Sequence, residues 1–403
     1  MADAPGIRPW LTIVGLGEDG PDGLLPASRH ALDAAEVVIG AKRHLALLPD
    51  LKAETVEWPV PFADGIPVLH AHRGRRVVML ASGDPFWFGA GAVIARGLDP
   101  GEWHALPGRS TFSLAAARLG WPLDRTLCLG LHAAPLTRLK PYLAPGTRAI
   151  ALLRDGEAVS GLAAYLRGEG FGATQFTVLE ALGGPRERVT AGTAQNPPDT
   201  AHAHPAAVAL DVAGEGAVIP CASGIEDSFF DTDGQITKRP VRALALSALA
   251  PRPFETLWDI GGGSGSIAIE WLLSHSRTEA VSIERRADRA ARIRANADRL
   301  GVDRLAVVEG EAPSVLDGLA VPHAVFIGGG LSDALLGDLT ARLAPGTRLV
   351  AHAVTLDSEA LLSAWSERIG GSLLRMDLSE ASPLGAKRGW KAAYPVVQWR
   401  VVL

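Results

Sequence analysis

Short apolar runs alternate with helix-like segments in two separate series along this chain, and this pattern limits its fold most strongly. The runs are rich in Val, Ile, Leu and Ala, and they lie at 11–14, 37–40, 77–81 and 206–212 in the first series and at 257–260, 280–283, 306–308 and 324–327 in the second. Runs of this length next to glycines predict buried strands, and their alternation with helices predicts mainly parallel sheets covered on both faces. We therefore expect an α/β protein built from two independent units.

A change in composition separates the two series. Asn, Pro, Asp, Thr and His dominate 193–205, and the small residues 213–216, which follow the last apolar run, are the best candidate for a hinge. A chain of 403 residues also has about the length of two average domains. We predict a first domain over 1–212, a hinge over 213–223 and a second domain over 224–403.

Composition argues against several classes of partner. The formal net charge of −5 is not that of a strongly basic nucleic-acid-binding protein. The two cysteines, Cys128 and Cys221, are too few and too far apart for a disulfide framework or a cysteine zinc site, and we expect no other metal site. No stretch reaches the roughly 18 apolar residues that cross a bilayer, and the N-terminus lacks the pattern of a signal peptide. We expect a cytoplasmic protein that binds neither membranes nor nucleic acid.

The strongest local signal is a glycine-rich loop between a predicted strand and a predicted helix. Asp259 begins it, Gly261, Gly262, Gly263, Ser264 and Gly265 follow, and Glu284 stands at the tip of the next strand. Glycines let a bulky ligand lie against the backbone, and the helix N-terminus offers free amide donors. An acid at this spacing accepts hydrogen bonds from both ribose hydroxyls. These residues predict a site for a nucleoside cofactor.

Two cofactors compete for this site. Residues 263–268 match the GxGxxA pattern, so a nicotinamide dinucleotide is a candidate. Three features favour S-adenosylmethionine. Asp259 is placed to meet a ligand ammonium group, residues 309–313 follow the third strand where an adenine would be held, and the crossing segment 385–395 suggests a reversed seventh strand. A glycine turn that binds nothing is the structural alternative.

A second glycine pattern, at 15–20, follows the first apolar run but is a poor match for a dinucleotide site. Pro21, Gly23 and Pro26 prevent a helix from starting at the loop, and the acids at 18–19 would repel a phosphate. Further along, Ser82-Gly83-Asp84-Pro85 follows a buried strand, where α/β proteins present ligands. A type I turn that begins a helix would explain the same four residues without a function.

These motifs together resemble known families. The N-terminal half resembles the tetrapyrrole (corrin/porphyrin) methylases over about residues 10–212, through motifs at 13–17, 81–85, 107–111 and 179–188. The C-terminal half is similar to the decarboxylating precorrin methyltransferases with a class I fold, through motifs at 225–229, 236–243, 259–265 and 310–313. Both halves in one chain resemble a fused family of aerobic cobalamin (vitamin B12) biosynthesis. One departure is Glu18-Asp19, where the methylases often have Pro-Gly.

The resemblance implies a two-lobed α/β unit followed by a class I, Rossmann-like methyltransferase domain with a seven-stranded mixed sheet. It implies methylation of a precorrin at macrocycle carbons 5 and 15, with decarboxylation of the ring C acetate, to give precorrin-8X. Each domain would bind one S-adenosylmethionine, and a homo-oligomer (dimer or tetramer) is implied. The cofactor-binding residues would be Gly83, Asp84, Ser110, Thr111, Leu182, Thr237, Asp259, Gly261, Gly262, Gly263, Ser264, Gly265, Glu284, Glu311 and Ala312.

A tetrapyrrole precursor carries many carboxylates, so cationic side chains must meet it, preferably arginine. We predict that Lys238, Arg239 and Arg242 bind substrate in the second half. In the first half, Arg109 and His132 lie close to the motif loops and are the corresponding candidates.

An electron-rich tetrapyrrole supplies its own carbon nucleophile, so we expect no catalytic triad, no metal and no redox cofactor. His352, after the run 349–351, is a candidate general acid or base, and Asp84 is the other candidate catalytic residue. Three alternatives stay open: a dinucleotide-dependent oxidoreductase with an N-terminal substrate domain, a methyltransferase acting on another tetrapyrrole, and a tetrapyrrole carrier whose cofactor sites have decayed.

Overall fold

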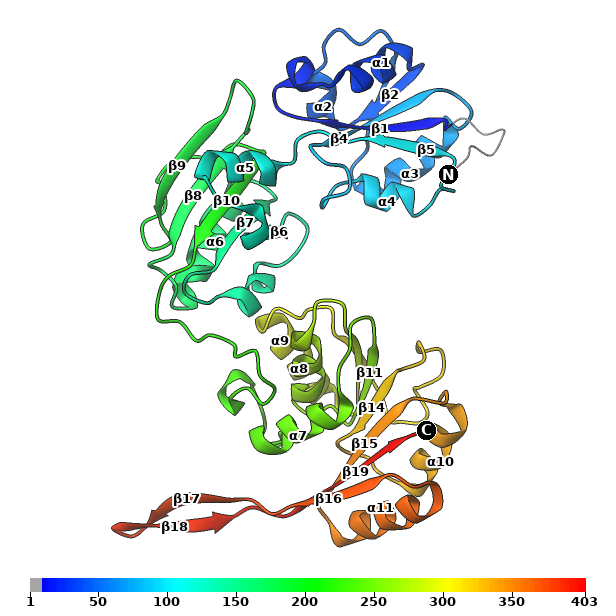
Figure 1. Cartoon of the computed structure of the whole chain (residues 1–403), viewed down its shortest axis with the longest axis vertical. Coiled ribbons are helices and arrows are strands. Elements are labelled where there is room, and N and C mark those ends of the chain that lie inside the picture. The colour runs from blue at the N-terminus through cyan, green and yellow to red at the C-terminus, as the bar shows by residue number, and fades with distance from the viewer. Residues whose placement is uncertain (1–8) are drawn as a thin grey trace. The chain divides into compact units, whose positions relative to one another are not determined.

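The computed structural model describes residues 9–403, and the chain divides into two compact units (Figure 1). Unit 1 comprises the residues up to Pro135 together with Leu143–Ala217, and unit 2 comprises Leu136–Tyr142 with Val218–Leu403. The expectation that the N-terminus is not a signal peptide concerns in part residues 1–8, which lie outside the described residues. Within residues 9–403, no helix combines the length and the apolar character needed to cross a membrane.

The first sheet of unit 1 is entirely parallel. Its strands, in the order β3-β2-β4-β1-β5, are β1 (Leu11–Leu16), β2 (Val37–Gly40), β3 (Glu54–Glu57), β4 (Val77–Ser82) and β5 (Trp103–Leu106). Ile13 and Met79 pack into a core on one face, whereas Val14 and Leu80 pack into a core on the other. Both faces are buried, which explains why these strands are continuous apolar runs. The surrounding helices are α1 (Pro26–Ala34), α2 (Lys42–Ala46), α3 (Gly65–Ala71) and α4 (Gly91–Ala95).

The second sheet of unit 1 is mixed, so the expectation of mainly parallel sheets is wrong here. Its strands, in the order β6-β7-β10-β8-β9, are β6 (Leu127–Gly130), β7 (Arg148–Leu153), β8 (Gln175–Glu180), β9 (Arg188–Thr193) and β10 (Ala206–Asp211). Only β6 and β7 pair in parallel. The loop between β8 and β9 is too short for a crossover helix, so these strands form an antiparallel hairpin. Helices α5 (Thr111–Leu119) and α6 (Glu157–Gly168) accompany this sheet.

Unit 2 contains the seven-stranded mixed sheet that was expected. Its strands, in the order β13-β12-β11-β14-β15-β19-β16, are β11 (Thr256–Ile260), β12 (Glu279–Glu284), β13 (Ala306–Glu309), β14 (Ala324–Ile327), β15 (Arg348–Ala353), β16 (Ser372–Met376) and β19 (Val396–Val402). The last strand, β19, runs antiparallel to both of its neighbours. The reversed final strand predicted from the sequence is therefore confirmed.

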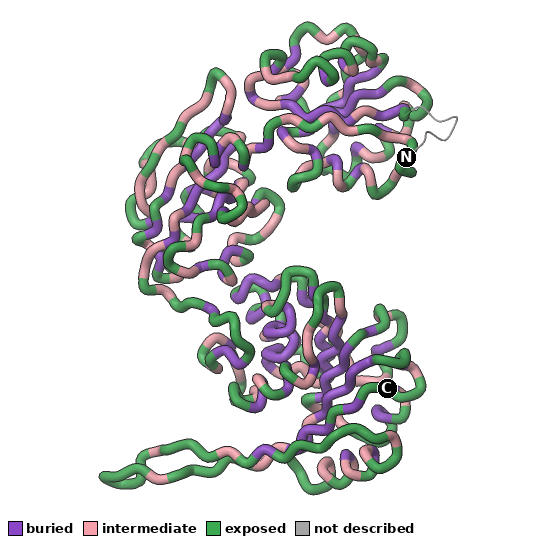
Figure 2. Tube along the Cα trace, viewed as in Figure 1, coloured by how far each residue is buried: buried purple, intermediate pink, exposed green. Residues whose placement is uncertain are grey.

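Helices cover both faces of this sheet. One core contains side chains from α7 (Arg239–Leu249), α8 (Ser266–Ser274) and α9 (Ala287–Arg299), and the other contains side chains from α10 (Asp333–Arg342) and α11 (Leu356–Ile369). Figure 2 shows the central strands buried between these layers. The 3₁₀ turns of the chain are η1 (Gly20–Gly23), η2 (Phe62–Asp64), η3 (Leu123–Arg125), η4 (Leu136–Tyr142) and η5 (Asp227–Phe229).

A two-stranded hairpin lies between β16 and β19. Its strands, β17 (Ser379–Leu384) and β18 (Lys387–Ala392), pair only with each other among the described strands. Figure 1 shows it projecting from unit 2. Sequence analysis treated the segment 385–395 as a simple crossing, because alternation over so few residues with few apolar side chains gives little strand signal.

Candidate active sites

Three glycines bring loop backbones together at the carboxyl end of the first sheet of unit 1. A β-carbon on Gly15 would overlap the carbonyl oxygen of Gly83 and the backbone nitrogen of Gly108. The N–H of Gly108 donates to the Gly83 carbonyl over 3.0 Å, and Gly83 has a φ of +53° that favours glycine. The first glycine motif therefore serves backbone packing. It is followed by the turn η1, and α1 begins only at Pro26, so the loop does not lead directly into a helix.

A cavity of about 430 Å³ lies beside these loops, within the range of roughly 300–1,000 Å³ that is typical of small-molecule sites. All seven residues predicted for the N-terminal site line it, namely Gly83, Asp84, Arg109, Ser110, Thr111, His132 and Leu182. Ser110 also caps α5, because its Oγ accepts from the Ser113 N–H over 3.0 Å. Asp84 Oδ1 accepts from the Phe86 N–H over 2.8 Å. A turn and a functional site were alternative explanations of the Asp84 motif. In the structure Asp84 both belongs to a turn and lines the cavity.

The acids that depart from the methylase pattern are paired with arginines. Glu18 is buried and forms ion pairs with Arg43 and, over 2.7 Å, with Arg186. Asp19 forms an ion pair with Arg109. No local sequence pattern indicates this network, because its members are distant along the chain. The charge repulsion expected from an isolated acidic loop is therefore offset by neighbouring guanidinium groups.

Aromatic side chains form much of the remaining cavity wall in unit 1. Trp58, Phe62, Trp87 and Phe88 line it, and the ring of Trp87 lies 4.9 Å from that of Phe112. The aromatic run directly after Asp84-Pro85 was a signal that sequence analysis did not use. His44 also lines this cavity, and burial, with the adjacent Arg43 charge, lowers its pKa to about 3. Its ring is therefore neutral at physiological pH.

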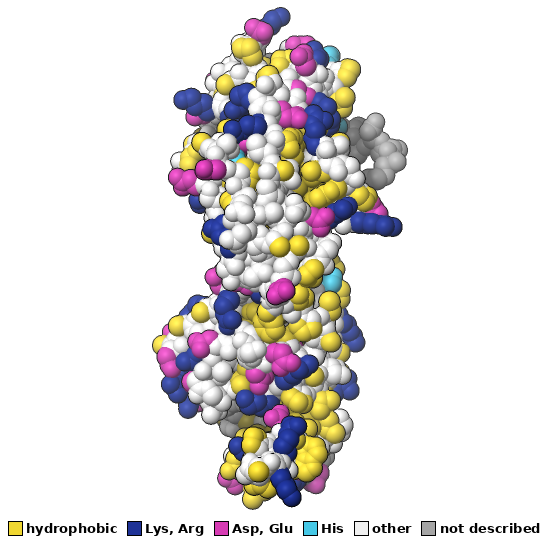
Figure 3. Space-filling view, turned by 90° about the vertical axis from the view of Figure 1, so that its left-hand side faces the viewer, with side chains coloured by type: hydrophobic (Ala, Val, Ile, Leu, Met, Phe, Trp, Pro, Cys, Tyr) yellow, Lys and Arg dark blue, Asp and Glu magenta, His cyan; other side chains and the backbone are white. Residues whose placement is uncertain are grey.

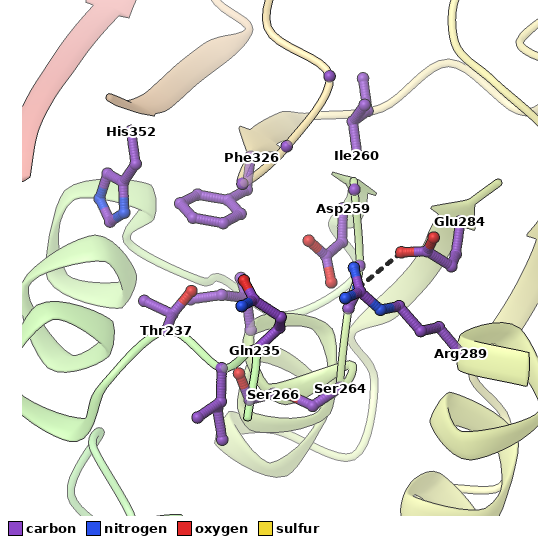
Figure 4. Close-up of a pocket in the computed structure, with 18 of the residues that line it drawn as sticks. Gln235, Thr237, Asp259, Ile260, Ser264, Ser266, Glu284, Arg289, Phe326 and His352 are labelled. Atoms are coloured by element: carbon purple, nitrogen blue, oxygen red, sulfur yellow. Dashed lines mark hydrogen bonds between the residues drawn. The ribbon is translucent and has the colours of Figure 1, made fainter. Parts of the chain in front are cut away.

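Unit 2 has a cavity of about 600 Å³ at the carboxyl ends of β11, β12, β14 and β15 (Figure 4). The predicted residues that line it are Thr237, Lys238, Asp259, Gly261, Gly262, Gly263, Ser264, Glu284, Glu311, Ala312 and His352. A β-carbon on Gly261 would approach the backbone nitrogen of Gly329 to 2.6 Å. The loop after β11 therefore packs directly against the loop after β14, and glycine is required at this contact.

Two carboxylates give this cavity its electrostatic character. Asp259 is fully buried, and this burial, reinforced by the charge of Glu284, raises its pKa to about 7. Within residues 9–403, Asp259 Oδ2 and the hydroxyls of Ser264 and Ser282 have no hydrogen-bond partner. Glu284 accepts from the N–H of Gly263 over 2.9 Å and from that of Arg286 over 3.0 Å. Each carboxylate oxygen of Glu284 retains a lone pair for a further donor.

Unpartnered buried polar atoms in a cavity are costly unless a ligand meets them. The acceptor groups here suit a ligand that presents an ammonium group near Asp259 and hydroxyl groups near Glu284. Adenosylmethionine carries both an ammonium group and ribose hydroxyl groups, and the sequence predicted that Asp259 and Glu284 would meet them. The donor and acceptor chemistry of the cavity therefore fits that cofactor.

The chain matches two families in order. Residues 10–198 match the Tetrapyrrole (Corrin/Porphyrin) Methylases, and residues 228–403 match the precorrin methyltransferase domain. A Sinorhizobium protein named precorrin-6Y C(5,15)-methyltransferase (decarboxylating) is 49% identical over 98% of this chain and 96% of its own. This chain belongs to the decarboxylating precorrin-6Y methyltransferase family.

A further relative of this methyltransferase agrees with that placement. A Mycobacterium tuberculosis protein of the same name is 40% identical over 97% of this chain and 99% of its own. The crystal structure of the C-terminal domain of precorrin-6Y C5,15-methyltransferase from Rhodobacter capsulatus is 52% identical and covers 46% of this chain and 100% of its own, with a TM-score of 0.45. Both family resemblances inferred from the motifs are confirmed.

Three predicted site residues of this methyltransferase do not line the cavity of unit 2. Gly265 precedes α8 and faces Ile293 instead. Arg239 donates to the carbonyl of Gly224 over 2.8 Å and forms an ion pair with Glu226. Both residues are therefore held by neighbouring parts of the chain.

Arg242, the third of these residues, is completely buried. Its guanidinium pairs with Glu270 and donates to the carbonyls of Thr237 and, over 2.6 Å, Ile225. Arg242 lies on the side of α7 that faces α8. Nothing in the local sequence pattern indicated that this arginine would be buried there. The structure thus assigns Arg242 to holding the segment 225–237, which lies beside the cavity, and not to direct contact with substrate.

Other residues of the cavity in unit 2 escaped sequence analysis. They include Gln235, Arg289, Phe326, Tyr394 and Val396. Arg289 donates to Asp233 over 2.8 Å, so this cation is partly neutralised. Tyr394 follows the β17–β18 hairpin, and no motif surrounds it. Such residues reach the cavity through the tertiary arrangement of the strands, which local sequence patterns do not encode.

Proposed function

We propose that this chain methylates precorrin-6Y at macrocycle carbons 5 and 15 and removes the carboxyl group of the ring C acetate, giving precorrin-8X, in aerobic cobalamin biosynthesis. The observation that carries this proposal is that each unit has its own cavity at the carboxyl ends of parallel strands, beside glycine loops. Whole-length similarity to decarboxylating precorrin-6Y methyltransferases supports it.

We also propose one S-adenosylmethionine per unit. In unit 2, Asp259 and Ser264 would hold the ammonium end and Glu284 the ribose, since their free acceptor atoms suit those groups. In unit 1, the backbone around Gly83 and Ser110 would hold the cofactor beside Leu182. When bound, adenosylmethionine supplies an electrophilic methyl group.

The residues of the chain would contribute mainly by orientation and by excluding water. Placing the acceptor carbon close to the methyl group and in line with it can supply several kcal/mol of the barrier reduction, about 7–11 in favourable cases. Cations would hold the substrate carboxylates, with Lys238 in unit 2 and Arg43 and Arg109 in unit 1. Burial lowers the pKa of His132, so this residue would contribute a hydrogen bond from a neutral ring. The macrocycle provides the electron pair, so neither cavity needs a nucleophilic side chain.

We propose that unit 2 carries out methylation at carbon 15 together with the decarboxylation, and that unit 1 methylates carbon 5. We keep the domain limits of 1–212 and 224–403 as a proposal for the two activities, although the compact units differ from them in that Leu136–Tyr142 belongs to unit 2. Their support is the family order along the chain, with the methylase match preceding the precorrin methyltransferase match.

The test uses the intact chain, precorrin-6Y and adenosylmethionine carrying a labelled methyl group. We expect two labels in each product molecule and one released carbon dioxide, measured by mass spectrometry and gas capture. Titrations with adenosylhomocysteine and with NADH serve as the comparison, and only adenosylhomocysteine should saturate. Product without label, or saturable NADH binding, would favour the oxidoreductase or carrier alternatives.

We further propose a cytoplasmic homo-oligomer in which a second copy of this chain covers the β17–β18 hairpin. An isolated two-stranded hairpin is marginally stable in water, yet Leu384 and Trp390 on it are 70% and 80% exposed. The lower end of Figure 3, where this hairpin points toward the viewer, shows hydrophobic side chains beside basic ones. Light scattering should give the molecular mass of a dimer or tetramer for the unmodified protein. The double variant Leu384→Ser with Trp390→Ser should have a lower mass in solution, because the oligomer dissociates.

A further inference from the structure

His352 occupies a defined position at the wall of the cavity in unit 2. It lies near the carboxyl end of β15, on the same face as Val350, because alternate residues of a strand share a face. The ring of Phe326 meets the His352 ring edge-on, with centroids 4.9 Å apart and planes at 86°. Figure 4 shows both rings on the side of the cavity away from Glu284. The imidazole is therefore near the end of β14 and separate from the residues proposed to hold the cofactor.

Gln398 fixes the protonation pattern of this ring. The two residues are direct partners across the antiparallel pair β15–β19, and His352 Nε2 lies 3.0 Å from Gln398 Oε1. An amide oxygen only accepts, so Nε2 carries the hydrogen. Nδ1 then has a free lone pair, and no hydrogen bond reaches it from the described part of the chain. Burial lowers the pKa of His352, so the resting ring is neutral, and its free Nδ1 lone pair is the atom at which a proton can be accepted.

The proposed reaction both releases and consumes a proton. Methylation replaces a hydrogen of the macrocycle with a methyl group, so one proton is released overall. In the decarboxylation, the bond between the methylene carbon and the carboxylate carbon breaks, and the electron pair enters the conjugated macrocycle. Carbon dioxide leaves, and the methylene carbon must then gain one proton to become a methyl group. Until that proton arrives, carbon dioxide held in the cavity can recombine with the electron-rich carbon.

We propose that His352 is a catalytic residue that carries this proton: Nδ1 takes up the proton that methylation releases from the macrocycle and delivers it to the methylene carbon left by decarboxylation, while Gln398 holds the ring in the required tautomer. This inference rests on the function proposed above. Because burial lowers the pKa of His352, the transient imidazolium is a stronger acid than an exposed one, which favours delivery of the proton once the electron pair is available. Gln398 acts through His352 and is a positioning residue.

The first test measures carbon dioxide release by the intact His352→Ala chain. General acid–base catalysis contributes about 10²–10⁴-fold, so we expect release to slow by at least about 100-fold. Calorimetry should show unchanged affinity for adenosylhomocysteine, since His352 is apart from the proposed cofactor-holding residues. Added imidazole should restore release about tenfold by occupying the space left by the side chain. The matched control is His323→Ala, which precedes β14 at the opposite end of the sheet and should neither slow release nor respond to imidazole.

A second test needs no reaction and no cofactor. Nitrogen NMR of histidine-labelled intact protein should show His352 as the Nε2–H tautomer, and Gln398→Leu should increase the Nδ1–H form. The same variant should slow carbon dioxide release while the folded spectrum persists. Rapid release by His352→Ala, or slow release without imidazole rescue, would overturn the proposal, as would an Nδ1–H tautomer in the unmodified protein. If the unmodified chain transfers no methyl group and releases no carbon dioxide, the proposed function itself fails, which is a different result.

Discussion

Gly263 donates its backbone N–H to Glu284 Oε2 over 2.9 Å, which joins the glycine loop after β11 to the acid at the end of β12. The site that we propose for the ribose in unit 2 is therefore preorganised, because Gly263 and Glu284 are both held in place by the fold. Preorganisation of this kind reduces the entropy lost on binding.

Glu284→Ala should remove the reaction of unit 2 and leave that of unit 1. Loss of two charge-assisted hydrogen bonds, each worth about 1.5–3 kcal/mol, should weaken cofactor binding in unit 2 by at least about 100-fold. Mass spectrometry should then find a singly methylated product that keeps every carboxyl group. Glu279→Ala, at the exposed start of the same strand, is the matched control and should give the normal product. Loss of both methylations in Glu284→Ala would contradict separate sites.

Cofactor affinity in unit 2 should increase with pH. The pKa of Asp259 is raised to about 7 in the ligand-free protein, so below pH 7 its carboxyl is mostly protonated. A ligand ammonium group favours the ionised form, and binding must therefore release a proton. Affinity should rise by up to about tenfold per pH unit below pH 7 and level off above it. Calorimetry between pH 5.5 and 8.5 in buffers of different ionisation enthalpy measures this release, and Asp259→Asn should abolish it.

The same carboxyl has a predictable effect on stability. Its folded pKa of about 7 lies above the value near 3.9 of an unfolded chain, so its contribution is fully present below about pH 4. As pH rises through 7, that contribution is lost and ligand-free unit 2 should become less stable. Urea unfolding of the intact protein at pH 5 and pH 8 should show this decrease, and Asp259→Asn should reduce it. An unfolding midpoint that is independent of pH in both proteins would show that Asp259 is ionised throughout.

The sequence predicted the features that depend on neighbouring residues. The apolar runs of β1, β11 and β12, the turn at Asp84 and the acid Glu284 all follow from local patterns, and the structure places them accordingly. Alternation of strands with helices also led to the correct fold class. A βαβ pattern constrains topology strongly, because parallel strands need crossover connections.

Features that depend on distant residues could not be predicted in this way. Glu18 meets Arg186, 168 positions away, and Arg242 meets Glu270, 28 positions away. Neither pairing leaves a periodic trace in the sequence, so Arg242 was predicted to bind substrate and the partner of Glu18 was not predicted. The antiparallel strands of the second sheet of unit 1 were missed for a related reason. Buried antiparallel strands have the same apolar character as parallel ones, and direction is decided by connection lengths and partners.

Arg242→Met should destabilise unit 2 strongly. The substitution leaves the buried carboxylate of Glu270 without its cation, and removing one partner of a buried ion pair typically costs about 3–5 kcal/mol. The unfolding transition of unit 2 in urea should shift accordingly. Arg239→Met is the matched control one helical turn away, since its half-exposed pair with Glu226 should contribute less than about 1 kcal/mol. A weaker affinity for precorrin with unchanged stability would instead indicate that Arg242 contacts substrate.

Gly15→Ala should impair unit 1 and spare unit 2. The added β-carbon would overlap the backbone of Gly83 and Gly108, so the three strand ends that support the cavity would have to separate. Forcing extra volume into such a contact costs about 1–3 kcal/mol, and we expect methylation at carbon 5 to fall at least tenfold while carbon dioxide release continues. Gly101→Ala is the control, because nothing lies within 4 Å of the β-carbon it would add. Equal stability and equal methylation at carbon 5 in the two variants would show that the close approach of these loops has no role in the N-terminal site.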